Sequence, residues 1–152
     1  MLSGKTAVIT GAGSGIGAAI ARRFAEAGAA LALWDITFSD DVRAAYAGLG
    51  DRVLCCEVDV TDEAAIRTAT TQATERFGHL DVLVNNAGIT RDRLLFRMDE
   101  KDWDAVLAVN LKGAFLCTKV VGRAMFSRRS GRIVNIASIN GQIGNVGQAN
   151  YA

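Results

Sequence analysis

The stretch TGAGSGIG, residues Thr10 to Gly17, joins a short apolar run, KTAVIT from Lys5 to Thr10, to a segment with helical periodicity. The apolar run predicts a β-strand, and apolar residues recur between Ile16 and Ala27 at the spacing of one helix face. A strand that turns sharply into a helix favours glycine, because glycine reaches positive φ without steric penalty and lets other groups approach the backbone. The first N–H groups of a helix have no partner inside the helix, so this junction predicts a site for the diphosphate of a nucleotide.

The spacing of these glycines differs from the common dinucleotide fingerprint G-x-G-x-x-G, which requires glycine where this chain has Ile16. The chain instead reads T-G-x-x-x-G-x-G. Two interpretations follow: a phosphate-binding loop, or a tight turn that only allows close helix packing. Under the first interpretation, the candidate cofactor-binding residues of the loop are Gly11, Gly13, Ser14, Gly15, Ile16 and Gly17.

Asp35 closes the next predicted strand, where an acidic side chain can accept hydrogen bonds from both ribose hydroxyls of an adenosine. The 2′-phosphate of NADP would bring about 1.5 to 2 negative charges beside this carboxylate. Repulsion at about 4 Å costs about 4 kcal/mol per pair of unit charges at an effective dielectric near 20. No Arg or Lys of the glycine loop offsets this repulsion, so we predict that NAD(H) is favoured over NADP(H). The alternative is that Asp35 only caps the following turn.

Composition limits the class of protein. The chain has 152 residues, half of them hydrophobic, and a formal net charge of +1, which predicts one domain over residues 1–152 and no nucleic-acid partner. We expect no membrane-spanning run and no signal peptide, and therefore a cytoplasmic location. The three cysteines lack C-x-x-C spacing, and adjacent Cys55 and Cys56 should point to opposite faces of a strand. Buried reduced thiols are therefore favoured over a disulfide or a metal site.

Strand and helix patterns alternate along the chain, which predicts an α/β fold: a doubly wound (Rossmann) parallel sheet with helices on both faces. The predicted strands are Lys5 to Thr10, Ala29 to Trp34, Arg52 to Val58, Asp81 to Asn85 and Arg132 to Ala137; the predicted helices are Ile16 to Ala27, Asp40 to Leu49, Asp62 to Phe77 and Glu100 to Ser127. Predicted N-caps are Ser39, Thr61 and Asp99, and predicted helix stops are Gly28, Gly50 and Gly78. Right-handed crossovers predict the strand order 3-2-1-4-5, with a ligand crevice at the carboxyl ends of strands one and four.

Polar residues follow the third and fourth predicted strands at this same edge of the sheet. Asp59, followed by Val60, is a candidate for binding adenine, and the run Asn86, Ala87 and Gly88 is a candidate for lying under the ribose. The alternatives are a turn aspartate and asparagines that satisfy the backbone at a strand end.

The long predicted helix carries one amide, Asn110, in an otherwise apolar stripe formed by Trp103, Leu107, Ala114, Cys117 and Val121. A polar group there must find hydrogen-bond partners or cost about 1 to 3 kcal/mol. Asn110 is therefore either a satisfied structural residue or one that organises water in a site.

Ser138 and Tyr151 flank a glycine-rich loop after the fifth predicted strand. A hydroxyl that donates to a substrate carbonyl and a tyrosine that delivers a proton would support hydride transfer between a nicotinamide and a ketone or carbinol. From the residues alone, Ser138 is equally well a turn residue and Tyr151 an aromatic residue at a helix start.

Taken together, TGAGSGIG, Asp59-Val60, NNAG, Asn110, Ser138 and Tyr151 resemble, in order and spacing, the short-chain dehydrogenase/reductase family along the whole chain. The resemblance implies that Tyr151 is the general acid/base, that Ser138 orients the substrate oxygen, and that Asn110 supports a proton-relay water. Three stretches, NNAGITRDRLLFRM, WDAVLAVNLKGAF and GNVGQANYA, are most similar to 3-oxoacyl-[acyl-carrier-protein] reductases, with acetoacetyl-CoA reductases next.

This similarity implies a small-molecule or carrier-bound 3-oxoacyl substrate, acyl carrier protein as a partner, and a homo-oligomer in the full-length form. Two alternatives are a dehydrogenase of another secondary alcohol, such as a sugar or steroid, and a non-catalytic nucleotide-binding module. Many such reductases prefer NADPH, from which Asp35 departs.

The family places a lysine four residues after its tyrosine, and this sequence ends at Ala152. We therefore expect a fragment of a longer enzyme that turns over poorly by itself, with Arg132 to Ala137 as an exposed apolar sheet edge. The cluster of Arg128, Arg129 and Arg132 either offsets a helix dipole or meets an acidic carrier protein. The only histidine, His79, is too isolated to suggest a metal site.

Overall fold

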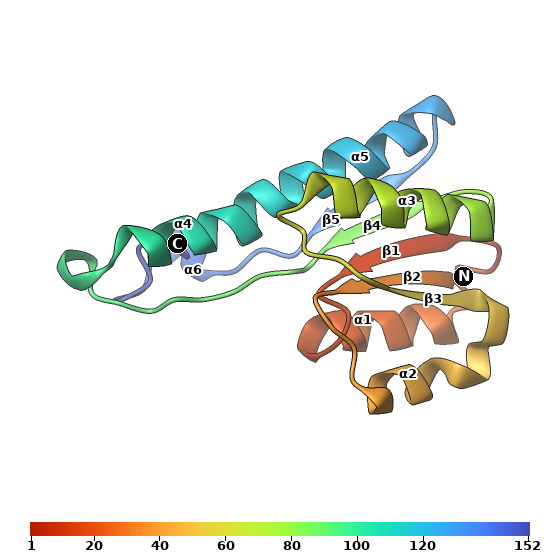
Figure 1. Ribbon diagram of the computed structural model, residues 1–152, viewed down its shortest axis with the longest axis horizontal. Helices are drawn as coiled ribbons and strands as arrows, with labels where there is room; N and C mark the ends of the chain where they lie inside the picture. Colours follow the sequence, from red (N-terminus) through yellow and green to blue (C-terminus); the bar gives the residue numbers. More distant parts are fainter.

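A five-stranded parallel sheet in the order β3-β2-β1-β4-β5 forms the centre of the computed structural model, which describes residues 1–152 (Figure 1). The strands are β1 (Thr6–Thr10), β2 (Ala30–Asp35), β3 (Val53–Glu57), β4 (Val82–Asn85) and β5 (Arg132–Asn135). Every neighbouring pair is parallel, with Thr10 beside Trp34 and Asn85 beside Asn135 at the carboxyl ends. The predicted fold class and strand order are confirmed.

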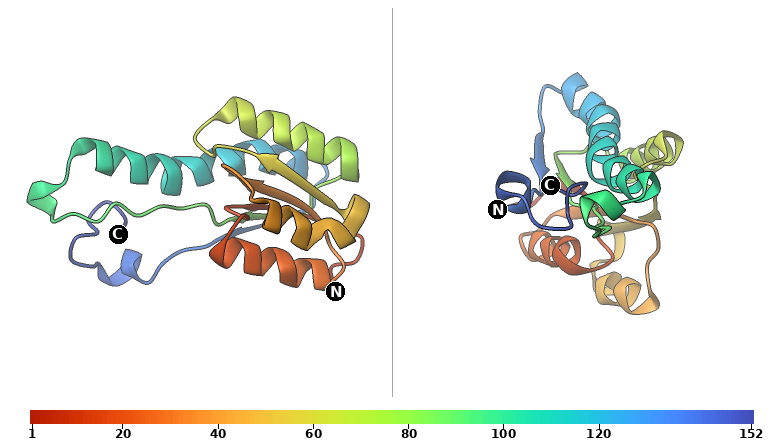
Figure 2. Two further views of the ribbon diagram at one scale, coloured as in Figure 1. Left: turned by 60° about the horizontal axis from the view of Figure 1, so that its bottom comes forward. Right: turned by 90° about the vertical axis from the view of Figure 1, so that its left-hand side faces the viewer.

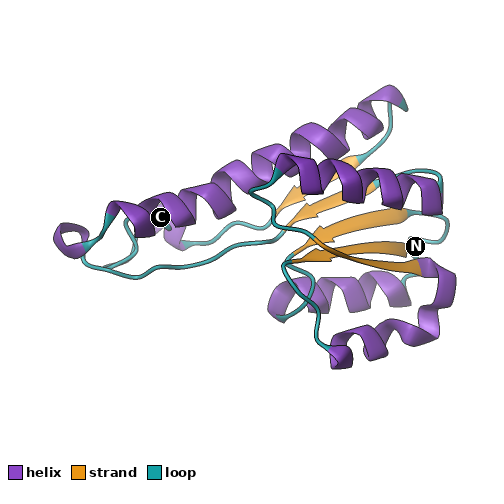
Figure 3. Ribbon diagram, viewed as in Figure 1, coloured by secondary structure: helices purple, strands orange, loops and turns teal.

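Helices cover both faces of this sheet (Figure 3). They are α1 (Gly15–Glu26), α2 (Asp40–Tyr46), the 3-10 helix η1 (Ala47–Arg52), α3 (Glu63–Phe77), the 3-10 helix η2 (Leu95–Arg97), α4 (Glu100–Leu107), the π turn η3 (Ala108–Gly113), α5 (Ala114–Ser127) and α6 (Asn140–Ile143). In Figure 1, α1 and α2 lie on one side of the sheet and α3 and α5 on the other. The last part of the chain and α4 form a lobe beyond the carboxyl ends of the strands (Figure 2).

Two buried clusters account for this layering. Alternate residues of β1 separate into them: Ile9 packs with α1 and α2, while Val8 packs with α3 and α5. Each strand of the sheet centre is apolar on both faces because each face is covered, and all five residues of β1 are buried. The two clusters also divide the adjacent cysteines, since Cys56 belongs to the α3 side and Cys55 contacts the α1 side. The predicted opposite orientation of these thiols is confirmed.

The edge strand β5 is exposed along its whole length, with Ile133 at 40% and Val134 at 43% exposure. The expected apolar sheet edge is therefore present, although the strand ends at Asn135 and not at Ala137. Pairing with β4 stops there because β4 itself ends at Asn85.

The predicted continuous helix from Glu100 to Ser127 is interrupted by the π turn η3. A π turn accommodates about one more residue than an α-helical turn, so the apolar stripe of α5 cannot be extended backwards with a single period. Trp103, predicted in the buried stripe, is 39% exposed, while Val106 is fully buried. The prediction was wrong for Trp103 and correct for Cys117 and Val121.

Side-chain and glycine caps define the start of α2 and both ends of α3. Ser39 is confirmed as the N-cap of α2, because its Oγ accepts a hydrogen bond from the Val42 N–H. Thr61 is not the N-cap of α3; Asp62 is, with its carboxylate accepting from the Ala64 and Ala65 N–H groups at 2.8 and 3.3 Å. Gly78 ends α3 at φ +79°, as predicted.

Other predicted boundaries changed more. Asp99 occupies the N-cap position of α4 but its side chain makes no capping bond. Gly28 directly follows the C-cap of α1, whereas Gly50 lies inside η1 with non-helical angles, so the predicted helix to Leu49 ends in a 3-10 segment after Tyr46.

The combined helix from Glu100 to Ser127 has 28 residues and is long and apolar enough to cross a membrane by length and composition alone. The sequence was expected to contain no membrane-spanning run, and a single helix that passes this test is weak evidence for one. Its apolar residues Leu116, Cys117 and Val121 are buried in the α3-side cluster, and the core helix of a soluble protein passes the same test.

Candidate functional site

The glycine loop packs tightly against the end of β4. Gly11 has φ +63°, and a Cβ built on it would lie 2.9 Å from the Ala87 Cα. A Cβ on Gly17 would lie only 2.0 Å from the carbonyl oxygen of Gly11. Glycine is therefore required at both positions by contacts within the protein, so the close-packing interpretation of the loop is correct for these two residues.

Gly15 differs from them, because its φ is +53° but a Cβ there would meet no protein atom within 4 Å. The neighbouring Ser14 is exposed and makes no side-chain capping bond to α1. The first turn of α1 contains no acidic residue, whereas α2 and α3 each have a side-chain cap and acidic residues in the first turn. The N-terminus of α1 thus keeps its positive dipole end open to an external anion, which fits the diphosphate of a dinucleotide.

Two polar side chains brace the glycine loop against β4. The Asn86 Nδ2 donates to the carbonyl oxygens of Thr10 and Gly11 at 3.0 and 3.1 Å. The Thr10 Oγ1 accepts hydrogen bonds from the backbone N–H groups of Asn86 and Ala87, each at 3.0 Å. The amide of Asn86 therefore acts on the loop backbone, and Thr10, which the sequence did not place among the site residues, fixes the turn after β4.

Asp35 lies at the carboxyl end of β2, half-buried beside the glycine loop. Its Oδ2 accepts from the Gly13 N–H at 2.7 Å, and its Oδ1 accepts from the N–H of Ile36 at 2.8 Å. The bond to Ile36 is a local turn contact, and the bond to Gly13 joins the carboxylate to the loop. Each carboxylate oxygen can accept more than one hydrogen bond, so this geometry leaves acceptor capacity for ribose hydroxyls.

The segment after β3 carries Asp59 and Val60. Asp59 is exposed, and its Oδ1 accepts from the N–H and hydroxyl of Thr61, each at 2.8 Å, which makes it a turn residue with one oxygen not used in that turn. Val60 is buried, and a Cβ on Gly113 would lie 2.7 Å from its Cγ2. Gly113 therefore lets the π turn approach this segment closely.

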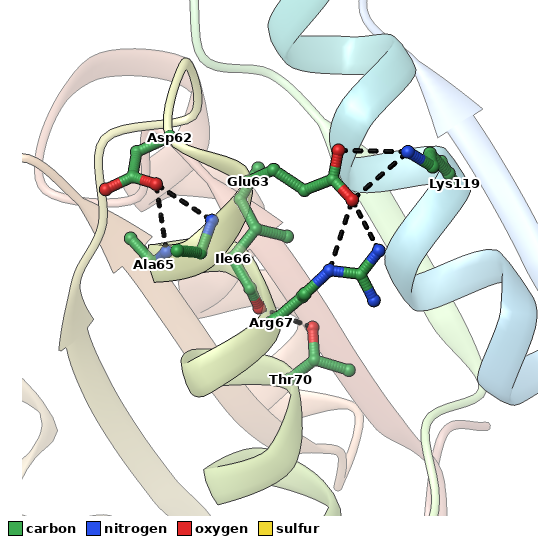
Figure 4. Close-up of polar contacts among 8 residues, drawn as sticks. Asp62, Glu63, Ala65, Ile66, Arg67, Thr70 and Lys119 are labelled. Carbon is green, nitrogen blue, oxygen red and sulfur yellow. Dashed lines mark hydrogen bonds and ion pairs between the residues drawn. The ribbon is translucent and has the colours of Figure 1, made fainter.

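Glu63, which begins α3, links this segment to α5 (Figure 4). Its carboxylate accepts from the Lys119 Nζ at 3.1 and 3.0 Å and from the guanidinium of Arg67. The hydrogen bonds from Lys119 and then Arg67 lower the pKa of Glu63. The contact fixes the start of α3 relative to the helix that follows the π turn.

Asn110 lies within the π turn and faces the chain that leaves β4. Its Oδ1 accepts from the Ile89 N–H at 2.8 Å, and its Nδ2 donates to the Ile89 carbonyl at 3.0 Å. The same Oδ1 would lie 3.4 Å from a Cβ on Gly88. The side-chain amide is thus satisfied by backbone, in agreement with the structural interpretation, and it holds the NNAG run against the long helix.

Ser138 and Tyr151 both lie in the lobe beyond the carboxyl ends of the strands. The Ser138 Oγ accepts from the Asn140 N–H at 3.2 Å, and the Tyr151 N–H donates to the Asn150 Oδ1 at 2.8 Å. No hydrogen bond joins Ser138, Tyr151 and Asn110 to one another, and the Tyr151 phenol makes none. The structure brings the loop residues, Asp35 and Asn86 into direct contact, while the three predicted catalytic side chains share only one end of the sheet.

The arginine cluster lies at the opposite end of the sheet, around the buried carboxylate of Asp81. Arg128 donates to the Leu80 carbonyl at 3.5 Å and lies 3.7 Å from the Asp81 Oδ1. This contact gives Arg128 a structural partner, Asp81, that the sequence interpretation did not include. Arg129 adopts a left-handed φ of +53° in the turn after α5.

The sequence pattern of the family described as short chain dehydrogenase matches residues 5–152. The chain is 47% identical over 153 residues to a Thermotoga maritima protein named 3-oxoacyl-[acyl-carrier-protein] reductase FabG, covering 99% of this chain and 62% of that protein. It is 44% identical over 151 residues to a Vibrio cholerae protein of the same name, with coverages of 99% and 62%.

A third relative, from Streptomyces niveus, is named short-chain reductase protein NovJ. It is 47% identical over 149 residues, which cover 96% of this chain and 56% of that protein. The chain spans about 62% of the length of the two reductases it matches.

Proposed function

The chain belongs to the short-chain dehydrogenase family, and from that premise we propose that residues 1–152 form the dinucleotide-binding domain of an NAD(H)-linked oxidoreductase. The observation that carries the proposal is the glycine loop. Gly15 leaves open space beside the N-terminus of α1, and no acidic side chain of the first helical turn competes for an anion. The diphosphate of the dinucleotide binds the N–H groups there.

Asp35 supports the choice of cofactor. The Gly13 N–H anchors the carboxylate beside the loop, and its remaining acceptor capacity suits the two ribose hydroxyls of the adenosine. A 2′-phosphate at that place meets the negative charge of the carboxylate, which favours NAD(H) over NADP(H). Asp59 and Val60 serve the adenine, and Asn86, Ala87 and Gly88 line the ribose.

The proposed chemistry is the reduction of a carbonyl or the oxidation of a secondary alcohol. The nicotinamide, when bound, supplies or accepts a hydride. Ser138 donates a hydrogen bond to the substrate oxygen and orients it. Tyr151 transfers the proton to or from that oxygen, and Asn110 holds the adjoining backbone at Ile89 so that a relay water can be ordered there.

The names of the relatives support a 3-oxoacyl thioester carried on acyl carrier protein as the substrate, and the proposal includes the same thioester carried on CoA. The proposal includes a homo-oligomeric enzyme in the cytoplasm, where the thiols of Cys55, Cys56 and Cys117 would stay reduced. The guanidinium groups of Arg129 and Arg132, which unlike that of Arg128 form no ion pair with Asp81, are the candidates for meeting an acidic carrier.

Two other functions stay open to the same test. One is the dehydrogenation of another secondary alcohol, such as a sugar or a steroid. The other is nucleotide binding without catalysis.

Calorimetric titration of NADH and NADPH into the 152-residue chain tests the cofactor proposal, with circular dichroism to verify folding. We expect NADH to bind more tightly than NADPH; folded protein that binds neither would refute the assignment. NADH oxidation by the complete gene product, measured with acetoacetyl-CoA, 3-oxoacyl carrier protein, sugars and steroids, separates the substrate classes. Binding with no turnover on any of them would support the non-catalytic alternative.

A further inference from the structure

The side chain of Gln148 is the centre of a hydrogen-bond cluster that joins three segments of the lobe. Its Nε2 donates to both carboxylate oxygens of Asp92, at 3.2 and 3.0 Å. Its Oε1 accepts from the Nδ2 of Asn140 at 2.8 Å and from the Nδ2 of Asn145 at 3.2 Å. An amide side chain has two N–H donors and one oxygen acceptor, so nearly all of its bonding capacity is used.

These three segments include the ones that carry the proposed catalytic hydroxyls. Asn140 is the residue whose N–H donates to the Ser138 Oγ. Gln148 begins the turn that carries Tyr151, because its carbonyl accepts from the Ala152 N–H at 2.8 Å. Asp92 belongs to the chain that follows the NNAG run. The side chain of Gln148 therefore connects the turn from Ser138 to Asn140 (the serine turn) and the turn from Gln148 to Ala152 (the tyrosine turn) to Asp92.

The backbone reinforces the same junction. Arg93 and Gln148 form an isolated parallel bridge, and the Arg93 N–H donates to the Gly147 carbonyl at 2.8 Å. The buried Asn150 donates to the carbonyls of Arg91 and Asp102 at 3.0 and 3.2 Å. Two backbone positions, Arg91 and Arg93, therefore hold the tyrosine turn by hydrogen bonds. The side chain of Gln148 links that turn to the serine turn.

Asp92 fixes the direction of the Gln148 amide. A carboxylate accepts hydrogen bonds and donates none, so the NH2 group must face Asp92 and the carbonyl must face the two asparagines. A reversed amide would place oxygen against carboxylate and leave the Asn140 and Asn145 NH2 groups facing another NH2. The charge of Asp92 therefore determines whether the link to the serine turn exists.

We propose that Gln148, oriented by Asp92, is the positioning residue that sets the separation of Ser138 and Tyr151. The proposal rests on the proposed function, since it assumes that these two hydroxyls act on one substrate oxygen. Gln148 itself touches no reacting atom. Its loss leaves both hydroxyls present but allows the serine and tyrosine turns to move independently, and misplacement of a reacting group by about 1 Å costs about 100-fold in rate.

Four variants separate this role from general loop stability: Gln148→Ala, Gln148→Glu, Asp92→Asn and the double variant Asp92→Asn with Gln148→Glu. Gln148→Glu opposes two carboxylates, while the double variant restores a donor and an acceptor with their places exchanged. Gln142→Ala is the matched control, because Gln142 is an exposed glutamine of α6, between Ser138 and Gln148, with no side-chain hydrogen bond.

The kinetic readout is ketone-dependent NADH oxidation by the complete gene product. We expect Gln148→Ala and Gln148→Glu to lower kcat about 10- to 100-fold with less than about threefold change in KM for NADH. The double variant should regain most of the activity that Gln148→Glu loses, and Gln142→Ala should match the parent. Equal loss in Gln148→Glu and the double variant, or no loss in Gln148→Ala, would overturn the proposal.

A second readout needs no turnover. The chain has two tyrosines, so 13C-tyrosine NMR of the 152-residue chain gives one ring signal for Tyr151 and one for the distant Tyr46. We expect Gln148→Ala to shift or broaden the Tyr151 signal and to leave the Tyr46 signal in place. An unmoved Tyr151 signal would refute the positioning role, whereas a parent protein that is inactive on every ketone but shows this shift would refute only the proposed function.

Discussion

The side-chain amide of Asn110 pairs with both polar groups of the Ile89 backbone, accepting from its N–H at 2.8 Å and donating to its carbonyl at 3.0 Å. The pairing joins the π turn to the chain that leaves β4. A neighbouring β-strand would offer Ile89 the same pair of hydrogen bonds, and here the side chain of Asn110 provides both. The NNAG run therefore continues past the sheet in a defined path although no strand accompanies it.

Replacement of Asn110 by Ala leaves both polar groups of Ile89 without these partners. We expect the free energy of unfolding to fall by about 1 to 3 kcal/mol, because two half-buried hydrogen bonds are lost at about 0.5 to 1.5 kcal/mol each. Urea denaturation measures the change. Leu111→Ala is the control in the same turn, because Leu111 is 67% exposed, and it should change stability by less than about 0.5 kcal/mol. Equal effects of the two variants would contradict this account of Asn110.

Alanine substitutions should distinguish the two kinds of glycine in the loop. Gly17→Ala forces a Cβ against the Gly11 carbonyl, so we expect the free energy of unfolding to fall by about 1 to 3 kcal/mol. We expect NADH binding to be lost in the same variant. Gly15→Ala costs only the left-handed conformation, about 1 to 2 kcal/mol, yet places a methyl group in the proposed phosphate space. Gly48→Ala, in open space without positive φ, is the control. Calorimetry and thermal unfolding of the same samples provide both measurements.

Asp35→Asn keeps an oxygen that can accept from the Gly13 N–H but removes the negative charge. We expect the ratio of NADPH to NADH affinity to rise about tenfold or more, since 1.4 kcal/mol of repulsion removed corresponds to a factor of about ten. Asp41→Asn, an exposed residue in the first turn of α2, should leave the ratio unchanged. An unchanged ratio in Asp35→Asn would show that this carboxylate does not select the cofactor.

Asp81 should make the fold sensitive to acid. Burial alone raises its pKa, but the Thr6 N–H, His79 and Lys5 outweigh burial, so the pKa lies below its ordinary value. A lowered folded-state pKa means that the stabilisation is present above about pH 4, the unfolded value, and is lost as pH falls through the folded value.

Asp81→Asn removes this ionisable group, so it should flatten the acid limb of the curve of unfolding free energy against pH. At pH 7 we expect the free energy of unfolding to fall by about 1 to 3 kcal/mol and no more, because the cationic partners of Asp81 are partly exposed. Asp51→Asn, which removes a fully exposed carboxylate paired with Arg76, should leave the limb in place. A parent and an Asp81→Asn variant with the same pH dependence would disprove the linkage.

The buried thiols should make the fold sensitive to alkali. Burial raises the pKa of Cys56 to about 11 and that of Cys117 to about 12. Their stabilisation is complete below the unfolded value of about 8.5 and is lost as pH rises through 11 to 12. At pH 8 a disulfide exchange reagent should label Cys55 first and Cys117 only on unfolding. The absorbance of the thiolate that the reagent releases measures how many cysteines have reacted. Rapid native labelling of Cys117 would contradict its burial.

The layering of the fold could be predicted from sequence because each central strand is a short apolar run bounded by turn residues. Both faces of β1 and β2 are covered, so composition alone identified them. The π turn could not be predicted, because an extra residue in a helix leaves no mark in composition and only shifts the apolar period. The N-cap of α3 was misassigned because Thr61 and Asp62 are both good caps and the neighbouring Asp59 holds Thr61.

The candidate site divides in the same way. The glycine loop and Asp35 were recognised because they lie on neighbouring strand ends, and the structure joins them by the bond from Gly13 to Asp35. The bond from Gln148 to Asp92 connects residues 56 positions apart, and neither residue belongs to a strand or helix whose position could be inferred. Only the amide-rich run GQAN hinted at a polar junction there.

The π turn has a consequence for how this chain tolerates changes in length. Deleting one residue from Ala108–Gly113 would convert the turn to regular helix and leave α5 close to its present rotation relative to α4, because a π turn takes up about one more residue than an α-helical turn. Leu116, Cys117 and Val121 would keep facing the sheet, whereas the local geometry that places Asn110 against Ile89 would change. A second deletion in the same stretch would find no extra residue to absorb it and would rotate α5 by about 100°, because each helical residue advances by that angle, so this helix can lose one residue here and keep its buried face.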